Sequence, residues 1–214
     1  MRFILRLWLP DRPGALGRVA SAIGSVGASL AAIDILEQEG GWAIDEIVVD
    51  AVDAPNAAEK LIAALRFVEG VNVEDIRETH GEVIDPRVDA LETAAELVEQ
   101  ADAESLLQTL VQRAAHDMSA DWAALMQLSA DSPLASTGEV PSAAWIRAFV
   151  AGSRSSDALS QAAAGLDDIA WAELVKAEAV LVVGRDGRPF RQRERRQLAP
   201  LARIADRRWA ELPS

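Results

Sequence analysis

Cysteine is absent from this chain of 214 residues. No disulfide, thiol nucleophile or cysteine-ligated zinc or iron–sulfur site can therefore form. Long hydrophobic runs are lacking too: none approaches the roughly 20 residues of a membrane span, and residues 1–14 lack the apolar core and the cleavage site of a signal peptide. These absences predict a cytoplasmic protein that does not bind a membrane.

Histidine is scarce, since the chain has only His80 and His116. The dipeptide His116-Asp117 also occurs in metal-dependent phosphohydrolases, but those enzymes need several further histidine ligands. The sequence has no G-x-S-x-G motif, no lysine-bearing phosphate loop and no G-x-G-x-x-G motif. We therefore expect His116 at the solvent-exposed end of a helix, and a protein with no metal, no cofactor and no enzymatic activity.

Positive charge is also in short supply, with 21 lysine and arginine residues against 34 acidic ones and a net charge of −13. This balance disfavours nucleic acid as a partner. The exception is the last segment, which is rich in arginine but has few aromatic residues to stack on bases. We favour a helix whose charged face lies in water or meets the acidic half of a second subunit. The arginines are Arg185, Arg188, Arg191, Arg193, Arg195, Arg196, Arg203, Arg207 and Arg208.

The first 80 residues show the periodicities of a small α+β domain. Residues 3–9 alternate in the manner of a strand, with Phe3, Leu5, Leu7 and Leu9 on one face. A helix ending near Gly27, two strands joined by a glycine-containing turn, a second helix and a last strand follow. The order βαββαβ predicts a ferredoxin-like fold in which two helices cover one face of an antiparallel sheet. The later strands are 28–36, 42–51 and 70–78, and the second helix lies within 55–68.

Residues 81–86 contain glycine and proline between two periodic stretches, which predicts a linker. The second domain then covers residues 87–214. Its first helix has a narrow apolar stripe that could pack on another helix or on its own copy, and Pro200 must kink the last helix or mark its late start. The stripe is Val88, Leu91, Ala95 and Val98, and the expected elements are helices at 87–100, 103–118, 142–150 and 190–209 and strands at 122–128, 134–139 and 177–185.

Two side-chain patterns in this half are assigned to its core. In the helix at 142–150, Trp145, Ile146 and Phe149 are expected to point inward. In the last helix, the apolar side chains are likewise expected to point inward. Residues 151–177 show no clear element.

The first predicted strand ends at Asp11-Arg12-Pro13-Gly14, directly before a helix. Pro13 suits a first helical turn, and Gly14 has no side chain to block another molecule. The free amide groups of such a helix start can hold a carboxylate. The simpler alternative is that Asp11 caps the helix and Pro-Gly only turns the chain.

The residues of this turn, followed by a glycine ahead of the second strand, resemble the start of an ACT domain, and the resemblance extends over residues 3–78. It implies a regulatory module that binds an amino acid between the first loop and the second strand of a paired domain. The residues carried over are Asp11, Pro13, Gly14 and Leu16, with Asp11 receiving the ligand's ammonium group. Ser29 stands where the family often has asparagine.

The second half resembles a reduced GAF domain, a fold that commonly binds cyclic nucleotides or other small molecules. The resemblance rests on the closing strand and last helix, with Phe190 and Glu194 at matching positions, and on the helix and strand that span 104–128. It implies no specific ligand here, and a packing or dimerising role is the simpler interpretation.

Together these patterns predict a non-enzymatic regulatory protein that binds an amino acid and forms a homodimer at least partly through residues 1–80. The alternative is an interaction scaffold with degenerate pockets. Asp45, Glu46 and Asp50 share one predicted strand, and we interpret them as part of a solvated face and not as an acid–base pair.

Overall fold

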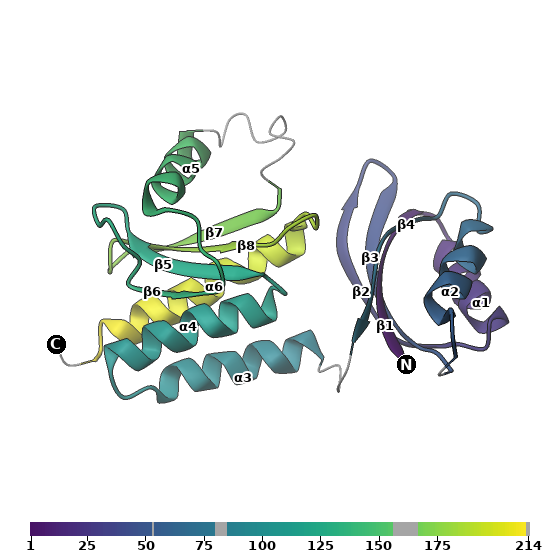
Figure 1. Cartoon of the computed structure of the whole chain (residues 1–214), viewed down its shortest axis with the longest axis horizontal. Coiled ribbons are helices and arrows are strands. Elements are labelled where there is room, and N and C mark those ends of the chain that lie inside the picture. Colours follow the sequence, from purple (N-terminus) through teal and green to yellow (C-terminus); the bar gives the residue numbers. More distant parts are fainter. Residues whose placement is uncertain (53, 80–84, 156–166, 213–214) are drawn as a thin grey trace. The chain divides into compact units, whose positions relative to one another are not determined.

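The structure, a computed structural model, describes residues 1–52, 54–79, 85–155 and 167–212. The chain divides into two compact units, Met1–Val83 and Ile84–Ser214. Each unit contains one four-stranded antiparallel sheet and its helices (Figure 1). None of the helices in the described ranges is both long and apolar enough to cross a membrane.

The first unit has the predicted βαββαβ order, so the mixed α+β class is confirmed. Its strands are hydrogen-bonded in the order β2-β3-β1-β4, and α1 and α2 lie on one face of the sheet (Figure 1). The elements are β1 (Arg2–Pro10), α1 (Ala15–Ser25), β2 (Ser29–Glu39), β3 (Trp42–Asp50), α2 (Ala57–Arg66) and β4 (Asn72–Thr79).

The core of this unit follows from the alternation of β1. Phe3, Leu5, Leu7 and Leu9 are buried on the helix-covered face, as predicted. They pack with apolar residues that α1 and α2 place at helical spacing. The helical members of the cluster are Ala15, Val19, Ile23, Ala57, Leu61 and Leu65.

Two glycine turns of this unit also agree with the sequence. Gly40 and Gly41 join β2 to β3 with φ of 60° and 83°, the left-handed conformation that a two-residue hairpin turn requires. Gly27, directly after the C-cap of α1, has φ of 76°. These residues allow the chain to reverse without the strain that a side chain would cause.

The second unit forms a sheet in the order β6-β5-β8-β7. Helices α3, α4 and α6 lie on one side of it and α5 on the other (Figure 1). The apolar core is accordingly in two parts, one on each side of the sheet. The elements are α3 (Pro86–Glu99), α4 (Ala103–Asp117), β5 (Trp122–Gln127), β6 (Ala135–Thr137), α5 (Ala143–Ser155), β7 (Ile169–Leu174), β8 (Ala179–Gly184) and α6 (Gln192–Trp209).

Several side-chain placements in this unit differ from the sequence-based expectation. The apolar stripe of α3 is exposed along its whole length, and the helix instead buries Thr93 and Leu97. In α5, Ile146 is buried as expected, whereas Trp145 is 40% exposed and stacks on Phe149 at 5.6 Å between ring centres. The side of α3 that faces inward is the one whose Asp89 and Thr93 contact Arg113 of α4.

The chain path differs in three places. Strand β7 occupies part of the stretch in which the sequence indicated no element. Its pattern was weak because its inward positions include the small residues Ala170 and Ala172. Helix α6 begins well before Pro200, so a late start is wrong. In the predicted linker, Asp85 caps α3 and Pro86 is its first residue, while residues 81–84 lie outside the described residues.

Candidate functional site

The turn between β1 and α1 is held by the backbone. The amide of Asp11 donates to the carbonyl of Gly41 at 2.9 Å, and the amide of Ala15 donates to the carbonyl of Arg12 at 3.2 Å. Gly14 occupies the N-cap position of α1 with φ of 84°. Because L-residues rarely adopt this conformation, a glycine is required where the strand becomes a helix.

The start of α1 has no side-chain cap. Within the described part of the chain, the amides of Leu16 and Gly17 have no hydrogen-bond acceptor. The carboxylate of Asp11 does not cap the helix but accepts a long hydrogen bond of 3.4 Å from Nε2 of Gln38. The capping role considered for Asp11 is therefore wrong, and the helix start retains amide donors for an anion.

A guanidinium group lies beside this helix start. A Cβ atom built on Gly14 would come within 3.6 Å of Nη1 of Arg18, an ordinary contact distance. Among the described residues Arg18 has no hydrogen bond or ion pair, whereas the neighbouring Arg12 lies 3.8 Å from a carboxylate oxygen of Glu69. Arg18 therefore adds an unpaired positive charge to the free amides.

Asp45 supplies an unexpected carboxylate close to the same turn. It lies opposite Leu7 in the sheet register and alternates with Ala43 and Ile47, so its side chain belongs to the helix-covered face. Only 3% of Asp45 is exposed, and its Oδ1 has no hydrogen-bond partner among the described residues. Burial, and second the charge of Asp11, raise the pKa of Asp45 to about 6.

The expectation of a solvated face is thus wrong for Asp45. Glu46 and Asp50 share the opposite face of β3, as expected from the alternation, and each is paired with an arginine of β1: Arg6 lies 3.1 Å from Glu46, and Arg2 donates to both oxygens of Asp50. The sequence contained a signal for this difference, because Asp45 occupies the otherwise apolar face of its strand. No comparable signal pointed to Arg18.

The five predicted site residues do not all meet. Asp11, Pro13 and Gly14 are exposed in the turn, and Leu16 is half-buried against the core of the first unit. Ser29 pairs with Asp50, whereas the turn follows Pro10, which pairs with Trp42. Ser29 therefore lies at the opposite end of the sheet, and one copy of the unit does not bring it to the other four residues.

A second cluster of polar side chains lies where α3 and α4 pack together. Ligand atoms of Asp89, His116 and Asp117 all lie within 4.8 Å of one another. A guanidinium group is already part of this cluster, since Arg113 lies 2.7 Å from Asp89 and 3.7 Å from Asp117. His116 is 63% exposed at the end of α4, as expected. We therefore interpret the cluster as ion pairs that join the two helices.

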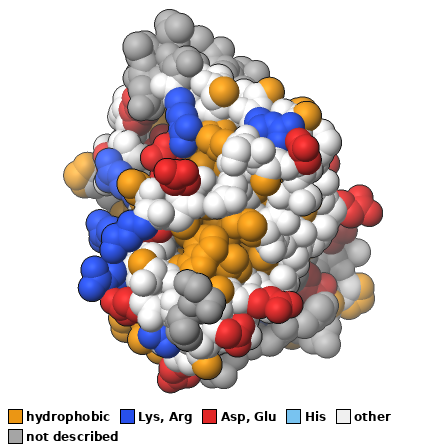
Figure 2. All heavy atoms as spheres, turned by 90° about the vertical axis from the view of Figure 1, so that its left-hand side faces the viewer, with side chains coloured by type: hydrophobic (Ala, Val, Ile, Leu, Met, Phe, Trp, Pro, Cys, Tyr) orange, Lys and Arg blue, Asp and Glu red, His pale blue; other side chains and the backbone are white. Residues whose placement is uncertain are grey.

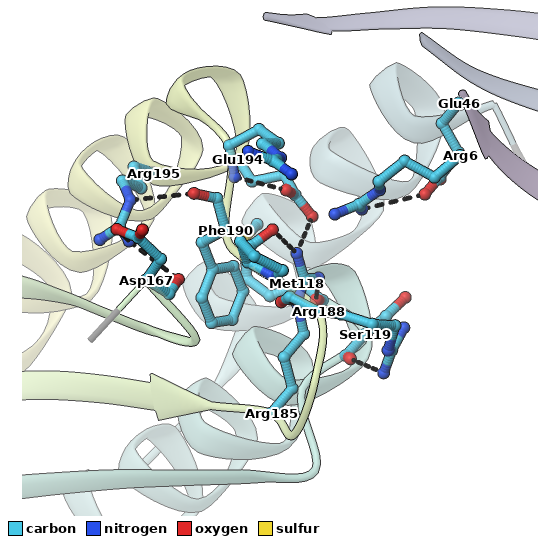
Figure 3. Close-up of polar contacts among 12 residues, drawn as sticks. Arg6, Glu46, Met118, Ser119, Asp167, Arg185, Arg188, Phe190, Glu194 and Arg195 are labelled. Atoms are coloured by element: carbon cyan, nitrogen blue, oxygen red, sulfur yellow. Dashed lines mark hydrogen bonds and ion pairs between the residues drawn. The ribbon is translucent and has the colours of Figure 1, made fainter. Parts of the chain in front are cut away.

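The arginine-rich segment is only partly solvated: Arg185 is buried, five of its arginines are half-buried, and three lie on an exposed face as expected. The side chain of Arg185 is 1% exposed and lies 2.7 Å from Glu194 (Figure 3). Its guanidinium also lies over the ring of Phe190 and donates to the carbonyls of Met118, Arg188 and Pro189. Arg195 donates to the carbonyls of Asp167, Ile169 and Phe190. Arg196, Arg203 and Arg207 are exposed.

Two open hollows lie near the turn between β7 and β8, with volumes of about 390 and 380 Å³. The buried carboxylate in the first, Asp206, already accepts hydrogen bonds from the amides of Lys176 and Ala177. In the second, Arg154 is paired with Glu173 at 2.8 Å. These charges are satisfied within the chain, so the turn of the first unit remains the stronger candidate.

Comparison with known proteins agrees with the first half of the interpretation. The family model of the ACT domain matches residues 3–70. ACT domains are in general regulatory domains for small molecules, so the match is consistent with a regulatory role. Curated proteins gave no match. The assignment of the second unit to a reduced GAF fold stays a prediction.

Solved structures show only distant likeness. GqqA, described as a novel type of quorum quenching acylase, is 19% identical over 36% of this chain and 43% of its own, with a TM-score of 0.27. A formyltetrahydrofolate deformylase from Pseudomonas putida KT2440 is 12% identical over 47% and 39%, with a TM-score of 0.31. An unknown protein from Galdieria sulphuraria is 13% identical over 62% and 75%, with a TM-score of 0.29. The chain spans less than half the length of the first two, and scores this low assign no function to it.

Proposed function

We propose that this chain is a non-enzymatic cytoplasmic regulator that binds an amino acid at the β1–α1 turn of its ACT domain. The observation that carries the proposal is the uncapped start of α1, where the amides of Leu16 and Gly17 have no acceptor among the residues that the structure describes. An amino acid offers the matching carboxylate, and the positive end of the helix favours it. Arg18 adds a cation on the same side, and Asp11 offers a charge for the ammonium group.

The proposal includes a homodimer formed through the first unit. Strand β2 is an edge strand of the sheet, and Ile33 and Ile35 on it are 38% and 46% exposed. Exposed apolar side chains on an edge strand favour pairing with another strand. Antiparallel pairing of two β2 strands would bring Ser29 of one copy to the Gln38–Glu39 end of the other, next to its turn. The dimer would thus reunite the predicted site residues.

The test is a thermal-shift panel of the twenty amino acids on the whole chain. A ligand at about 100 times its dissociation constant stabilises the folded state by about 2.7 kcal/mol. Asp11→Asn and Arg18→Ala should each abolish the shift caused by a responding amino acid. The matched control is Arg66→Ala, which removes an exposed arginine from the other helix of the same unit. A shift that survives both site variants would place the ligand elsewhere.

Light scattering tests the dimer separately. Ile35→Lys should convert a species of twice the chain mass into one of the chain mass, because it places a charge on the apolar edge of β2. A wild-type protein that is monomeric at micromolar concentration would contradict the dimer.

The second candidate function is an interaction scaffold. It is favoured by the exposed stripe of α3, in which Leu91 is 71% exposed. Figure 2 also shows one face of the molecule with a group of hydrophobic side chains near its centre and charged side chains around it. Exposed apolar areas of this kind often mark protein contacts. If none of the amino acids changes the melting temperature, the scaffold is the better description.

A further inference from the structure

Asp45 is a buried carboxylate to whose Oδ1 no described residue donates a hydrogen bond. On the helix-covered face its neighbours from β1 and β2 are the apolar Leu7 and Ile35, which lie opposite it in the register. The inward residues of α1, Ala15, Val19 and Ile23, are apolar as well. A buried carboxylate without a hydrogen bond or a cation is costly, so the arrangement calls for a positive partner.

The described charged groups of the turn are Asp11, Arg18 and Arg12, of which Arg12 is already paired with Glu69 at 3.8 Å. Asp11 in the turn interacts with Asp45 as a like charge, and Arg18 lies on α1 beside Gly14. Gln38 of β2, which donates to Asp11, is polar but uncharged. Apart from the Arg12–Glu69 ion pair, the site thus carries two negative charges, Asp11 and Asp45, and one positive charge, Arg18. A neutral amino acid, with one charge of each sign, leaves one carboxylate of the site without a cation.

We propose that Asp45 is a specificity-determining residue that selects a basic amino acid, whose side-chain cation it binds. This inference rests on the proposed amino-acid site at the turn. The ligand's carboxylate binds the amides of Leu16 and Gly17 and the guanidinium of Arg18, and its α-ammonium group binds Asp11. An ammonium or guanidinium at the end of the side chain then reaches Asp45. Such a ligand carries two positive charges and one negative charge, the complement of the site.

The protonation of Asp45 gives this selection a pH dependence. Because the pKa of Asp45 is about 6, the carboxyl group is ionised at pH 7.5 and only about a tenth ionised at pH 5. A ligand cation binds the ionised form. Its affinity should therefore fall about tenfold from pH 7.5 to pH 5, whereas a ligand with a neutral side chain should not lose affinity through this group.

The experiment is isothermal titration of the full chain with L-arginine and with L-citrulline, which replaces the guanidinium by a neutral group of similar shape. We expect L-arginine to bind the wild type at least ten times more tightly at pH 7.5. Asp45→Asn, which removes the charge and keeps the shape, should abolish this preference. Asp50→Asn, on the opposite face of the same strand, is the matched control and should keep it.

The outcomes separate this inference from the proposed function. Equal affinity for both compounds, a preference retained in Asp45→Asn, or binding of neutral amino acids alone would overturn the selection by Asp45 and leave the amino-acid site in place. Binding of no amino acid at all would overturn both. If Asp45→Asn does not fold, the pH dependence of L-arginine binding to the wild type decides, and an unchanged affinity between pH 5 and 7.5 would refute the proposal.

Discussion

Each unit of the chain holds a carboxylate in its interior, but the two carboxylates are treated differently. Burial raises the pKa of both Asp45 and Asp117 to about 6. Asp117 accepts a hydrogen bond from the hydroxyl of Thr93 at 2.8 Å and lies near Arg113. Among the described residues, Oδ1 of both carboxylates accepts no hydrogen bond, but Oδ1 of Asp117 lies 3.7 Å from Nη2 of Arg113, whereas Asp45 has no cation at such a distance. Burial alone therefore does not identify a binding group, because Asp117 is held by the hydroxyl of Thr93 and the charge of Arg113, and Asp45 has neither kind of partner among the described residues.

The same contrast extends to the cations. The second unit buries Arg185 among a carboxylate, three carbonyls and an aromatic ring. The first unit leaves Arg18 exposed and without a partner among the described residues. A group that is fully paired inside the chain stabilises the fold. A group that is positioned beside a helix start and left unpaired is available to a ligand.

The largest expected effect concerns the paired cation. Arg185→Met should lower the free energy of unfolding of the second unit by about 3–5 kcal/mol, because it leaves Glu194 without its buried partner. Denaturant unfolding provides the measurement. Arg203→Met, on the exposed face of α6, is the matched control and should change the value by less than about 0.5 kcal/mol. A loss below about 1 kcal/mol in Arg185→Met would mean that the network contributes little to stability.

The next effect is the pH dependence of the unpaired carboxylate. The pKa of Asp45 is higher in the folded chain, about 6, than its ordinary value of 3.8. The folded state therefore holds the proton more tightly, and stability due to this group is present below pH 4 and lost as the pH rises through 6. The loss amounts to about 3 kcal/mol. Denaturant unfolding between pH 4 and 7 should show this decline as a change in the difference in unfolding free energy between the wild type and Asp45→Asn. A difference that does not vary with pH would contradict the prediction.

A smaller effect is expected where a buried carboxylate loses its partner. Thr93→Val keeps the shape of a fully buried side chain but removes the hydroxyl that donates to Asp117 and accepts from Nε of Arg113. We expect a loss of about 1–3 kcal/mol, the cost of leaving these groups unsatisfied. The control is Thr109→Val on α4, whose side chain is half-buried and makes no hydrogen bond in the described structure. Equal losses in the two variants would show that the hydroxyl of Thr93 has no special role.

The first unit was predictable because its strands and helices have clear periods. The alternation of β1 and the apolar spacing of α1 and α2 indicate the same buried face. Asp45 was misinterpreted because three acidic residues in one strand suggested a solvated face, although Asp45 alternates with apolar neighbours. The free amides of α1 required the structure, since a residue type does not show whether a side chain caps a helix.

The second unit was less predictable because polar contacts determine which side of α3 faces inward. The apolar stripe would have buried Val88, Leu91 and Val98, yet Asp89 and Thr93 bind Arg113 of α4 and turn their own side of the helix inward. Hydrophobic periodicity does not record such contacts. Strand β7 was missed for a related reason, because its inward alanines give a weak hydrophobic signal.

The smallest expected effect concerns this exposed stripe, and it separates the two units as sites of assembly. Leu91 is 71% exposed, so Leu91→Ser should change the free energy of unfolding by less than about 0.5 kcal/mol. If the homodimer forms through β2, the variant should also keep the mass of the wild type in light scattering, whereas Ile35→Lys should not. Dissociation of Leu91→Ser with Ile35→Lys still dimeric would reverse the assignment. The second unit would then hold the copies together through α3, as the scaffold function requires, and Ser29 would need another route to the turn.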